Sequence, residues 1–330
     1  MANVTEAVNR CCCALRARRL WLFLLLAWLL WLLRGLLRLC KLRARDKECG
    51  RSNVPPWAVR KPDPMIYSQT FLQAQGVAVT WDNPDIHVEL AASPGVAVDS
   101  HALAPGTDHV VVARVWNGST TAPAVDLPVK LTYLAFGINT VRHDVGTVTV
   151  DLAVKGAAGC PASARIPWTT PSAPGHYCLQ VDLIWASDQE PGNNMGQHNT
   201  DVKPLNSPHA AFTFPFRNDA DRARRVRFEL DGYRIPGLEP CEDAQRSHEA
   251  HERRRAMAQR RHHRSEWPIP DGWRVVVEPA EVVVAGLDTV MVDVDVTAPD
   301  GFHGQQVVNV AAYEDSVLLG GVSLYVEGSG

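Results

Sequence analysis

The chain lacks the short motifs that mark the most common catalytic centres. Neither Gly-x-Ser-x-Gly nor His-Glu-x-x-His occurs in its 330 residues, and the glycine-rich signatures of nucleotide-binding loops are absent too. Residues that are distant in sequence can still assemble a catalytic triad. With no motif to carry catalysis, we expect a protein that is not an enzyme and that needs no cofactor.

An excess of charge of one sign is also missing. The chain has 33 lysines and arginines against 36 aspartates and glutamates, which gives a formal net charge of −3. Binding to nucleic acid generally needs a positive excess, so we expect no nucleic-acid partner. The length suggests about two domains with additional segments, because single cores usually stop growing near ~100–200 residues.

The eight cysteines lack the paired Cys-x-x-Cys spacing of structural zinc sites. Five of them lie before residue 50, in or beside the hydrophobic N-terminus, which is not a disulfide framework. Cys160 and Cys178 would be able to pair in an oxidising compartment. Cys178 lies opposite Tyr177 and Leu179 on its predicted strand, however, and this favours a free thiol on the outer face.

One long apolar run is present near the N-terminus. Residues 20–33 read LWLFLLLAWLLWLL, which would be apolar all around a helix and is typical of a segment in lipid. This run spans only about 21 Å of the ~30 Å hydrocarbon core, so a spanning helix must continue to about residue 40. We predict a single-pass membrane anchor at 20–40, with a cleaved signal peptide and an interfacial helix as alternatives. The residues expected to contact membrane lipid are Leu20, Trp21, Phe23, Leu26, Trp28, Trp31, Leu33, Arg34 and Arg38.

The rest of the chain is organised as a linker followed by β-structure. After the N-terminal basic segment and anchor in 1–49, residues 50–64 are rich in proline and charge, which predicts an extended linker. Beyond the linker, apolar and polar residues alternate with period two, as in the valines of 289–297. Strands with one buried and one wet face belong to antiparallel sheets.

This alternation and the turn residues between the runs predict two domains, 65–206 and 207–330, of seven short strands each. Such spacing is typical of a β-sandwich. We therefore predict an all-β fold with two tandem immunoglobulin-like antiparallel β-sandwiches, preceded by an N-terminal hydrophobic transmembrane helix. The strands are expected near 85–90, 109–117, 125–135, 145–152, 164–169, 176–185, 197–203, 210–216, 224–231, 273–278, 281–284, 289–297, 305–313 and 320–327.

Several stretches of both domains resemble a known family. PWTTPSAPGHYCLQVDLIW (167–185) and DQEPGNNMGQHNTDV (188–202) resemble bacterial Ig-like domains of the cell-adhesion-related (CARDB) type, in which an A-P-G-x-Y/H strand precedes a D-N-N-x-x-x-x-N strand. DGWRVVVEPAEVVV (271–284), APDGFHGQQVVNVAAY (298–313) and GGVSLYV (320–326) resemble related domains of secreted bacterial hydrolases and surface proteins. The resemblance implies a bacterial spacer, adhesion module or assembly part, in which binding is to protein.

The charge distribution and the family resemblance predict opposite sides of the membrane for the two domains. Basic residues flank the apolar run on both sides and are more numerous after it, so the positive-inside rule favours a cytoplasmic location. The family resemblance favours the extracytoplasmic side. We expect the extracytoplasmic location by a narrow margin.

The loop at 188–194 is a candidate for calcium. Asp188, Glu190, Asn193 and Asn194 supply the oxygen ligands that Ca²⁺ prefers. The same residues are common in any turn between strands, and that interpretation is favoured. Gly192 departs from the family pattern, because it replaces the first polar residue of the D-N-N run.

Residues 241–266 break the β pattern and predict a charged helical insertion in the second domain. His248 and His251 form a His-x-x-His pair, a weak zinc candidate without a third ligand. A solvated helix that touches nothing is the favoured interpretation, and contact with anionic lipid or an acidic partner is the alternative. The arginines available for such a contact are Arg253, Arg254, Arg255, Arg260, Arg261 and Arg264.

These patterns together predict a membrane-anchored, non-enzymatic protein that presents two Ig-like domains to a protein or surface partner. A homo-oligomer formed through sheet edges or the anchor helix is left open. The alternative function is an accessory module of an extracellular metal-dependent hydrolase, or a cryptic hydrolase of that kind.

Overall fold

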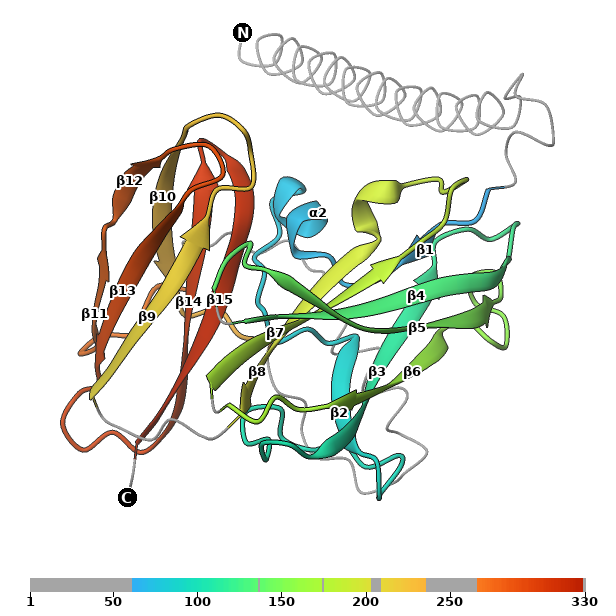
Figure 1. Cartoon of the computed structure of the whole chain (residues 1–330), viewed down its shortest axis with the longest axis horizontal. Helices are drawn as coiled ribbons and strands as arrows, with labels where there is room; N and C mark the ends of the chain where they lie inside the picture. The colour runs from blue at the N-terminus through green and yellow to red at the C-terminus, as the bar shows by residue number, and fades with distance from the viewer. Residues whose placement is uncertain (1–60, 136, 174, 203–208, 236–265, 329–330) are drawn as a thin grey trace, which may run out of the picture. The chain divides into compact units, whose positions relative to one another are not determined.

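The computed structural model describes residues 61–135, 137–173, 175–202, 209–235 and 266–328 (Figure 1). The predicted anchor, most of the predicted linker and nearly all of the charged insertion lie outside these residues. Within the described ranges, no helix is both long and apolar enough to cross a membrane. Residues 60–330 belong to one compact unit.

The all-β prediction is confirmed, and the paired strands are antiparallel. Fourteen strands lie at the predicted positions to within three residues at either end. Three elements were not predicted: the short strand β1 (Pro64–Met65), the helix α2 (Gln69–Ala74) and the 3-10 helix η1 (Pro191–Asn193). Helix α2 follows Ser68, a residue type that is common at a helix N-cap, but the Ser68 side chain makes no capping hydrogen bond. The helix is only six residues long and has no acidic residue in its first turn, so its sequence signal is weak.

The first sandwich consists of two four-stranded sheets. In one sheet β3 pairs with β1, β2 and β6, and in the other the order is β5-β4-β7-β8. Alternate residues of both sheets, such as Val111, Leu131, Ile166 and Leu179, are buried together in one core, which explains the period-two pattern. The strands are β2 (Ile86–Leu90), β3 (Asp108–Asn117), β4 (Ala124–Ala135), β5 (Arg142–Leu152), β6 (Ala162–Thr169), β7 (Gly175–Leu183) and β8 (Met195–Val202).

The second sandwich has a four-stranded sheet in the order β12-β10-β14-β15 and a three-stranded sheet in the order β11-β13-β9. Its core is separate and is formed by residues such as Phe214, Val294, Val310 and Leu324. The strands are β9 (His209–Arg217), β10 (Arg224–Asp231), β11 (Arg274–Glu278), β12 (Glu281–Val284), β13 (Thr289–Thr297), β14 (Gly304–Glu314) and β15 (Val317–Gly328).

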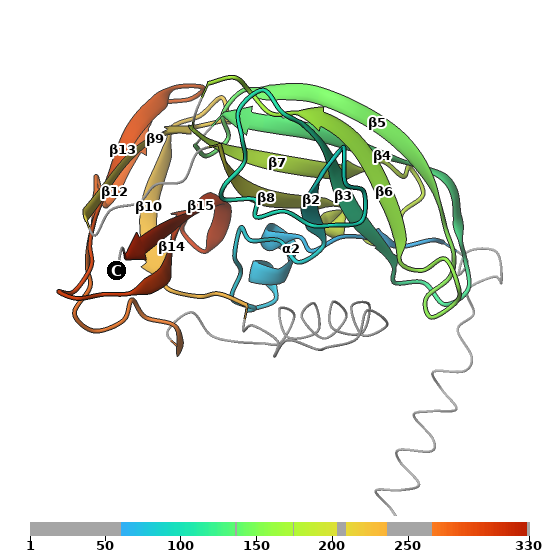
Figure 2. The ribbon, with the colours of Figure 1, turned by 90° about the horizontal axis from the view of Figure 1, so that it is seen from below.

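Strands β14 and β15 differ from the expected pattern of one wet and one buried face. Val310 of β14 points into the second core, yet its neighbours Ala311 and Tyr313 are buried as well. They belong to a third apolar cluster that includes Tyr67 and Trp81, from the segment around α2. Both views show α2 close to β14 and β15 (Figures 1 and 2), and the segment around α2 packs against the outer face of the sheet that these strands form.

Candidate functional site: a buried junction between the sandwiches

Trp81 is the central side chain of this junction. Only 1% of its surface is exposed, and its indole ring lies over Gly321 of β15. A Cβ atom at position 321 would lie 2.1 Å from Cη2 of the indole, so only glycine leaves room for the ring. The Trp81 backbone N–H donates to Ser323 Oγ at 3.2 Å, and indole Nε1 donates to Gln197 Oε1 at 3.3 Å. Trp81 thus connects β8 of the first sandwich to β15 of the second.

A chain of buried polar groups continues from Trp81 into the second sandwich. Ser323 Oγ donates to Asn309 Oδ1 at 2.6 Å, and Asn309 Nδ2 donates to Asp231 Oδ1 at 2.6 Å and to the Tyr233 carbonyl at 2.8 Å. All of these residues are almost completely buried. A buried polar network in which the groups are paired fixes the relative position of the elements it joins, since any slip would leave polar groups unpaired in a low dielectric.

The turn after Trp81 is held from the other side by the first sandwich. Asn83 Nδ2 donates to the Tyr67 carbonyl at 2.9 Å and to the Gln197 carbonyl at 3.1 Å. The Asp85 carboxylate accepts a hydrogen bond from the backbone N–H of Tyr67 at 2.8 Å and another from the indole N–H of Trp116 at 2.9 Å. Short polar side chains commonly hydrogen-bond nearby backbone in turns, which is why this Asp-Asn-Pro-Asp sequence fits here.

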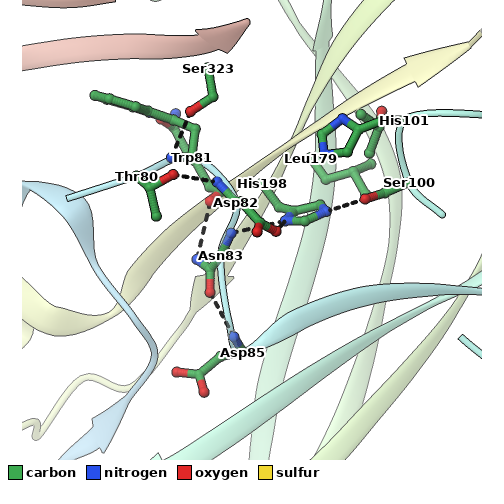
Figure 3. Close-up of polar contacts among 12 residues, drawn as sticks. Thr80, Trp81, Asp82, Asn83, Asp85, Ser100, His101, Leu179, His198 and Ser323 are labelled. Carbon is green, nitrogen blue, oxygen red and sulfur yellow. Dashed lines mark hydrogen bonds and ion pairs between the residues drawn. The ribbon is translucent and has the colours of Figure 1, made fainter. Parts of the chain in front are cut away.

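Beside this turn, three residues lie in an order that resembles a catalytic triad (Figure 3). His198 Nε2 lies 3.0 Å from Ser100 Oγ, and Asp82 Oδ1 lies 3.9 Å from His198 Nδ1. The backbone N–H of Asn83, however, donates to His198 Nδ1 at 3.0 Å. That nitrogen is therefore the acceptor, and in the neutral ring Nε2 carries the proton and donates to the serine. A histidine in this tautomer cannot take a proton from Ser100, so the arrangement positions the loop at residue 100 rather than activating a nucleophile.

Two further histidines contact a single carboxylate at the same junction. His101 Nδ1 lies 2.9 Å from Asp201 Oδ2, and His176 Nδ1 contacts Oδ1 of the same carboxylate. Burial lowers the pKa of His101 and lowers the pKa of His176 to about 4. At neutral pH both rings are therefore uncharged and present N–H groups to Asp201. The His101 ring lies 3.8 Å from that of Tyr325, centroid to centroid, and so reaches the second sandwich.

The loop named as a calcium candidate contains the 3-10 helix η1, and its polar side chains hydrogen-bond one another, nearby backbone and Asp63. Asp188 accepts from the Glu190 backbone N–H and from Asn194 Nδ2, both at 2.8 Å, while Glu190 accepts from the Gly192 backbone N–H at 3.2 Å. Asn193 Nδ2 donates to Asp63 at 3.1 Å. Among the described residues, no group of three or more His, Cys, Asp or Glu side chains is placed to hold a metal ion. Calcium at this loop remains the less favoured alternative.

The other candidate residues are either outside the described ranges or not joined to one another. The anchor residues, the His248–His251 pair and the six arginines of the insertion lie outside them. Cys160 and Cys178 are both free thiols, as favoured. Cys178 does lie on the outer face of its sheet, but that face is covered, and burial raises the pKa of its thiol to about 12.

Sequence reasoning missed the junction, although one signal for it was present. The outer face of β15 carries Gly321 and Ser323, and that of β14 carries Asn309 and Ala311, where a solvated strand would show charged side chains. Small residues in such a row indicate that another element packs closely. The histidines at 101, 176 and 198 are far apart in the sequence, so nothing local indicated that they meet.

Comparison with known proteins adds little. No protein-family model matches the chain, and no curated protein matches it. It is similar to the Yersinia pseudotuberculosis adhesin InvE at 14% identity and a TM-score of 0.20, over 76% of this chain and 60% of that one. It is similar to red sea bream transglutaminase (11%, TM-score 0.23, 74% and 31% covered) and to Escherichia coli alpha-2-macroglobulin (11%, TM-score 0.22, 74% and 22% covered). The chain spans less than two thirds of each of these proteins, and at such TM-scores the likenesses carry no argument.

Proposed function

We propose that this chain is a membrane-anchored, non-enzymatic binding or structural protein that holds two immunoglobulin-like domains in a fixed arrangement and presents them to a partner. The anchor is the apolar run at 20–33 with its extension to about residue 40, and the proline-rich linker separates it from the sandwiches. The extracytoplasmic side, the CARDB type and the protein or surface partner belong to the same proposal.

The junction is the observation that carries this proposal. An enzyme's interdomain surface generally leaves a cleft for substrate, whereas here Trp81 fills the hollow at Gly321 and the polar groups behind it are paired. Tight packing of this kind favours a rigid spacer, because binding by a pre-organised scaffold avoids the ordering cost of a flexible one.

The direction of the hydrogen bonds that His198 makes supports a non-enzymatic role in the same region. Its Nδ1 accepts a backbone N–H, and so its Nε2 donates to Ser100. The one serine–histidine–aspartate arrangement discussed above is thus set for hydrogen bonding and lacks a general base.

Membrane anchoring is tested with the full chain and a variant that lacks residues 1–49. The full chain should remain in the membrane fraction after carbonate extraction, and the shortened chain should not. A reporter that works on one side of the membrane only, fused to Gly330, should be active on the extracytoplasmic side. Release of the full chain by carbonate would refute anchoring. A reporter that is active in the cytoplasm would refute an adhesion function and favour an intracellular, membrane-tethered scaffold.

Fixed spacing is tested by a distance measurement between the sandwiches. Val125 on β4 and Met291 on β13 are each more than half exposed, so nitroxides attached there through unnatural amino acids should not disturb either core. Double electron–electron resonance should give one narrow distribution of the nitroxide–nitroxide distance for the full chain and a broader one for the Trp81→Ala variant. A broad distribution in the unmodified chain would refute a rigid arrangement.

The alternative function, a metal-dependent hydrolase or a module of one, is tested by metal analysis. Zinc and calcium are measured in the purified full chain after dialysis against metal-free buffer. Neither metal should be present in stoichiometric amount. One equivalent of zinc that is lost in a His248→Ala, His251→Ala variant would favour the hydrolase instead.

A further inference from the structure

Two histidines of the first sandwich lie where it contacts the second sandwich. His101 belongs to the loop between β2 and β3, and His176 is the second residue of β7. The ring of His101 lies 3.8 Å from that of Tyr325 on β15, and the ring of His176 lies 5.7 Å from that of Phe212 on β9, centroid to centroid. Both histidine side chains are mostly buried, so the contact between the sandwiches shields them from water.

The two rings share one carboxylate. Nδ1 of His101 lies 2.9 Å from Asp201 Oδ2, and Nδ1 of His176 contacts Oδ1 of the same group on β8. The other charged groups that act on His101 come from the segment after α2, from its own loop and from β15, and they are Asp82, Asp99 and Glu327. The titratable group that acts on His176 is His101 itself, and it lowers the pKa of His176.

A single carboxylate can compensate one imidazolium but not two. Each neutral ring donates from Nδ1, so a further proton adds at Nε2. The first proton should go to His101, because three more carboxylates act on it, and its charge then disfavours the second proton on His176. The second proton leaves an uncompensated positive charge in a buried contact, which is costly. The Phe212 ring is tilted 60° to that of His176, so a cation–π contact compensates little.

Separation of the sandwiches would hydrate both rings while each sandwich keeps its own sheets. The loop that carries His101 is bonded to β8 within the first sandwich, since the Asp201 N–H donates to the Ser100 carbonyl at 2.8 Å and the Leu103 N–H donates to the Asp201 carbonyl at 2.9 Å. Each sandwich also has its own hydrophobic core. The two histidines and their carboxylate can therefore stay together in an open form, in which water replaces the aromatic rings of β9 and β15.

Other contacts resist this separation. Trp81 packs over Gly321, and Ile138 from the loop after β4 is buried in the second core. The Ile138 N–H donates to the Pro215 carbonyl at 2.9 Å, and the Arg217 N–H donates to the Ile138 carbonyl at 3.1 Å. These contacts contain no group that titrates near neutral pH, so they hold the closed form when the histidines are neutral.

From this geometry we infer that the contact between the sandwiches is an acid-sensitive switch, in which protonation of both His101 and His176 releases the second sandwich from the first. The inference rests on the proposed fixed arrangement and adds a means of regulating it. Above neutral pH the chain presents its domains as one rigid body, and in acid it presents them as two bodies on a flexible joint.

The direction and size of the effect follow from proton linkage. Burial in the closed form holds the pKa of His176 at about 4, whereas a hydrated histidine has an ordinary value of 6.5, so the open form binds more protons between these values. The closed form is fully favoured above pH 6.5. As the pH falls to 4, the equilibrium constant for opening should rise about 150-fold from His176 alone. The lowered pKa of His101 adds to this rise.

The test is native-state hydrogen exchange of the detergent-purified full chain between pH 7.5 and 4, followed by mass spectrometry and corrected for the intrinsic exchange rate. The amides of Ile138 and Arg217 report on opening, because their hydrogen bonds cross between the sandwiches. The central strands β3 and β13 report on global unfolding. The amides that report on opening should show a larger opening constant than the central strands at every pH, and this constant should rise at least 100-fold in acid.

Neutral glutamine replaces the titrating groups. His176→Gln should make the rise less steep, and the double variant with His101→Gln should change little with pH, since glutamine keeps an N–H for Asp201 but takes up no proton. His143→Gln is the matched control. His143 is an exposed histidine on β5 that stacks on Tyr133, away from the junction, and its variant should behave as the unmodified chain does.

Each other outcome overturns the inference. An opening constant that does not change with pH would do so, and equal constants at Ile138 and in the central strands would show that the protein unfolds as a whole. A rise that persists in the double variant, or is lost in His143→Gln, would assign the pH dependence to other groups. If the double variant is not folded at pH 7.5 by circular dichroism, His176→Gln alone decides. A narrow nitroxide distance distribution at pH 7.5 together with a constant that ignores pH would refute the switch alone, whereas a broad one at pH 7.5 would refute the proposed fixed arrangement.

Discussion

Replacement of Gly321 by alanine should have opposite effects depending on what stands at position 81. In the unmodified chain the new Cβ would lie 2.1 Å from Trp81 Cη2 and 2.4 Å from Cζ2, and overpacking of this kind costs about 1–3 kcal/mol. The backbone of Gly321 is not in the left-handed region, so alanine also reduces the entropy of the unfolded chain, which stabilises by about 0.4–1 kcal/mol. The clash is the larger effect, and we expect a net loss of about 1–2 kcal/mol.

Removal of the indole should reverse the sign. Trp81→Ala alone should cost about 3–5 kcal/mol, because a fully buried aromatic side chain is lost and a cavity remains. In that background Gly321→Ala meets no ring and should stabilise the protein by up to about 1 kcal/mol. The two changes should therefore be coupled by about 2 kcal/mol in a double-mutant cycle.

The cycle is measured by urea unfolding of the four full-length proteins, followed by circular dichroism, with the dependence of the unfolding free energy on urea compared between them. Gly146→Ala serves as the control, since a Cβ there would lie an ordinary 3.5 Å from Ile166 Cγ2. Additivity of the two changes within ~0.5 kcal/mol would refute the packing of Trp81 against Gly321 on which the rigid junction depends.

Three further predictions concern the same region. Because burial holds the pKa of His176 at about 4, below its ordinary 6.5, the unfolded chain binds more protons than the folded chain between those values; the stability is complete above pH 6.5, and about 3 kcal/mol of it should be lost as the pH falls towards 4. The lowered pKa of His101 acts in the same direction, and a melting temperature that does not change over this range would contradict both assignments. Asn309→Ala removes the link between two buried partners and should cost about 1–3 kcal/mol in urea unfolding, whereas a loss below ~0.5 kcal/mol would show that the network does not hold the junction. Cys178, buried and with a pKa of about 12, should react with iodoacetamide far more slowly than the half-buried Cys160 when each site is followed by mass spectrometry, and equal rates would contradict the burial of its face.

The strands could be predicted because their signal is local. In β13 the valines at 290, 292, 294 and 296 alternate with polar residues, and only one sheet geometry buries all of them on one side. The same reasoning placed Leu179 and Val181 of β7 in the first core. The helix α2 could not be predicted in this way, since it is six residues long and has no capping side chain.

The amino-acid sequence by itself determined the all-β class and the positions of the strands, because hydrophobic periodicity is a property of neighbouring residues and needs no knowledge of the rest of the fold. Only the tertiary structure decided which outer faces are covered and which side chains meet. Trp81 and Gly321 are separated by most of the chain, and His101 and Asp201 lie 100 residues apart. The free energy of such contacts depends on packing between whole sheets. The contact between the rings of Tyr133 and Trp168, 6.4 Å apart, has the same origin, since these residues come together only after two sheets have closed on a common core.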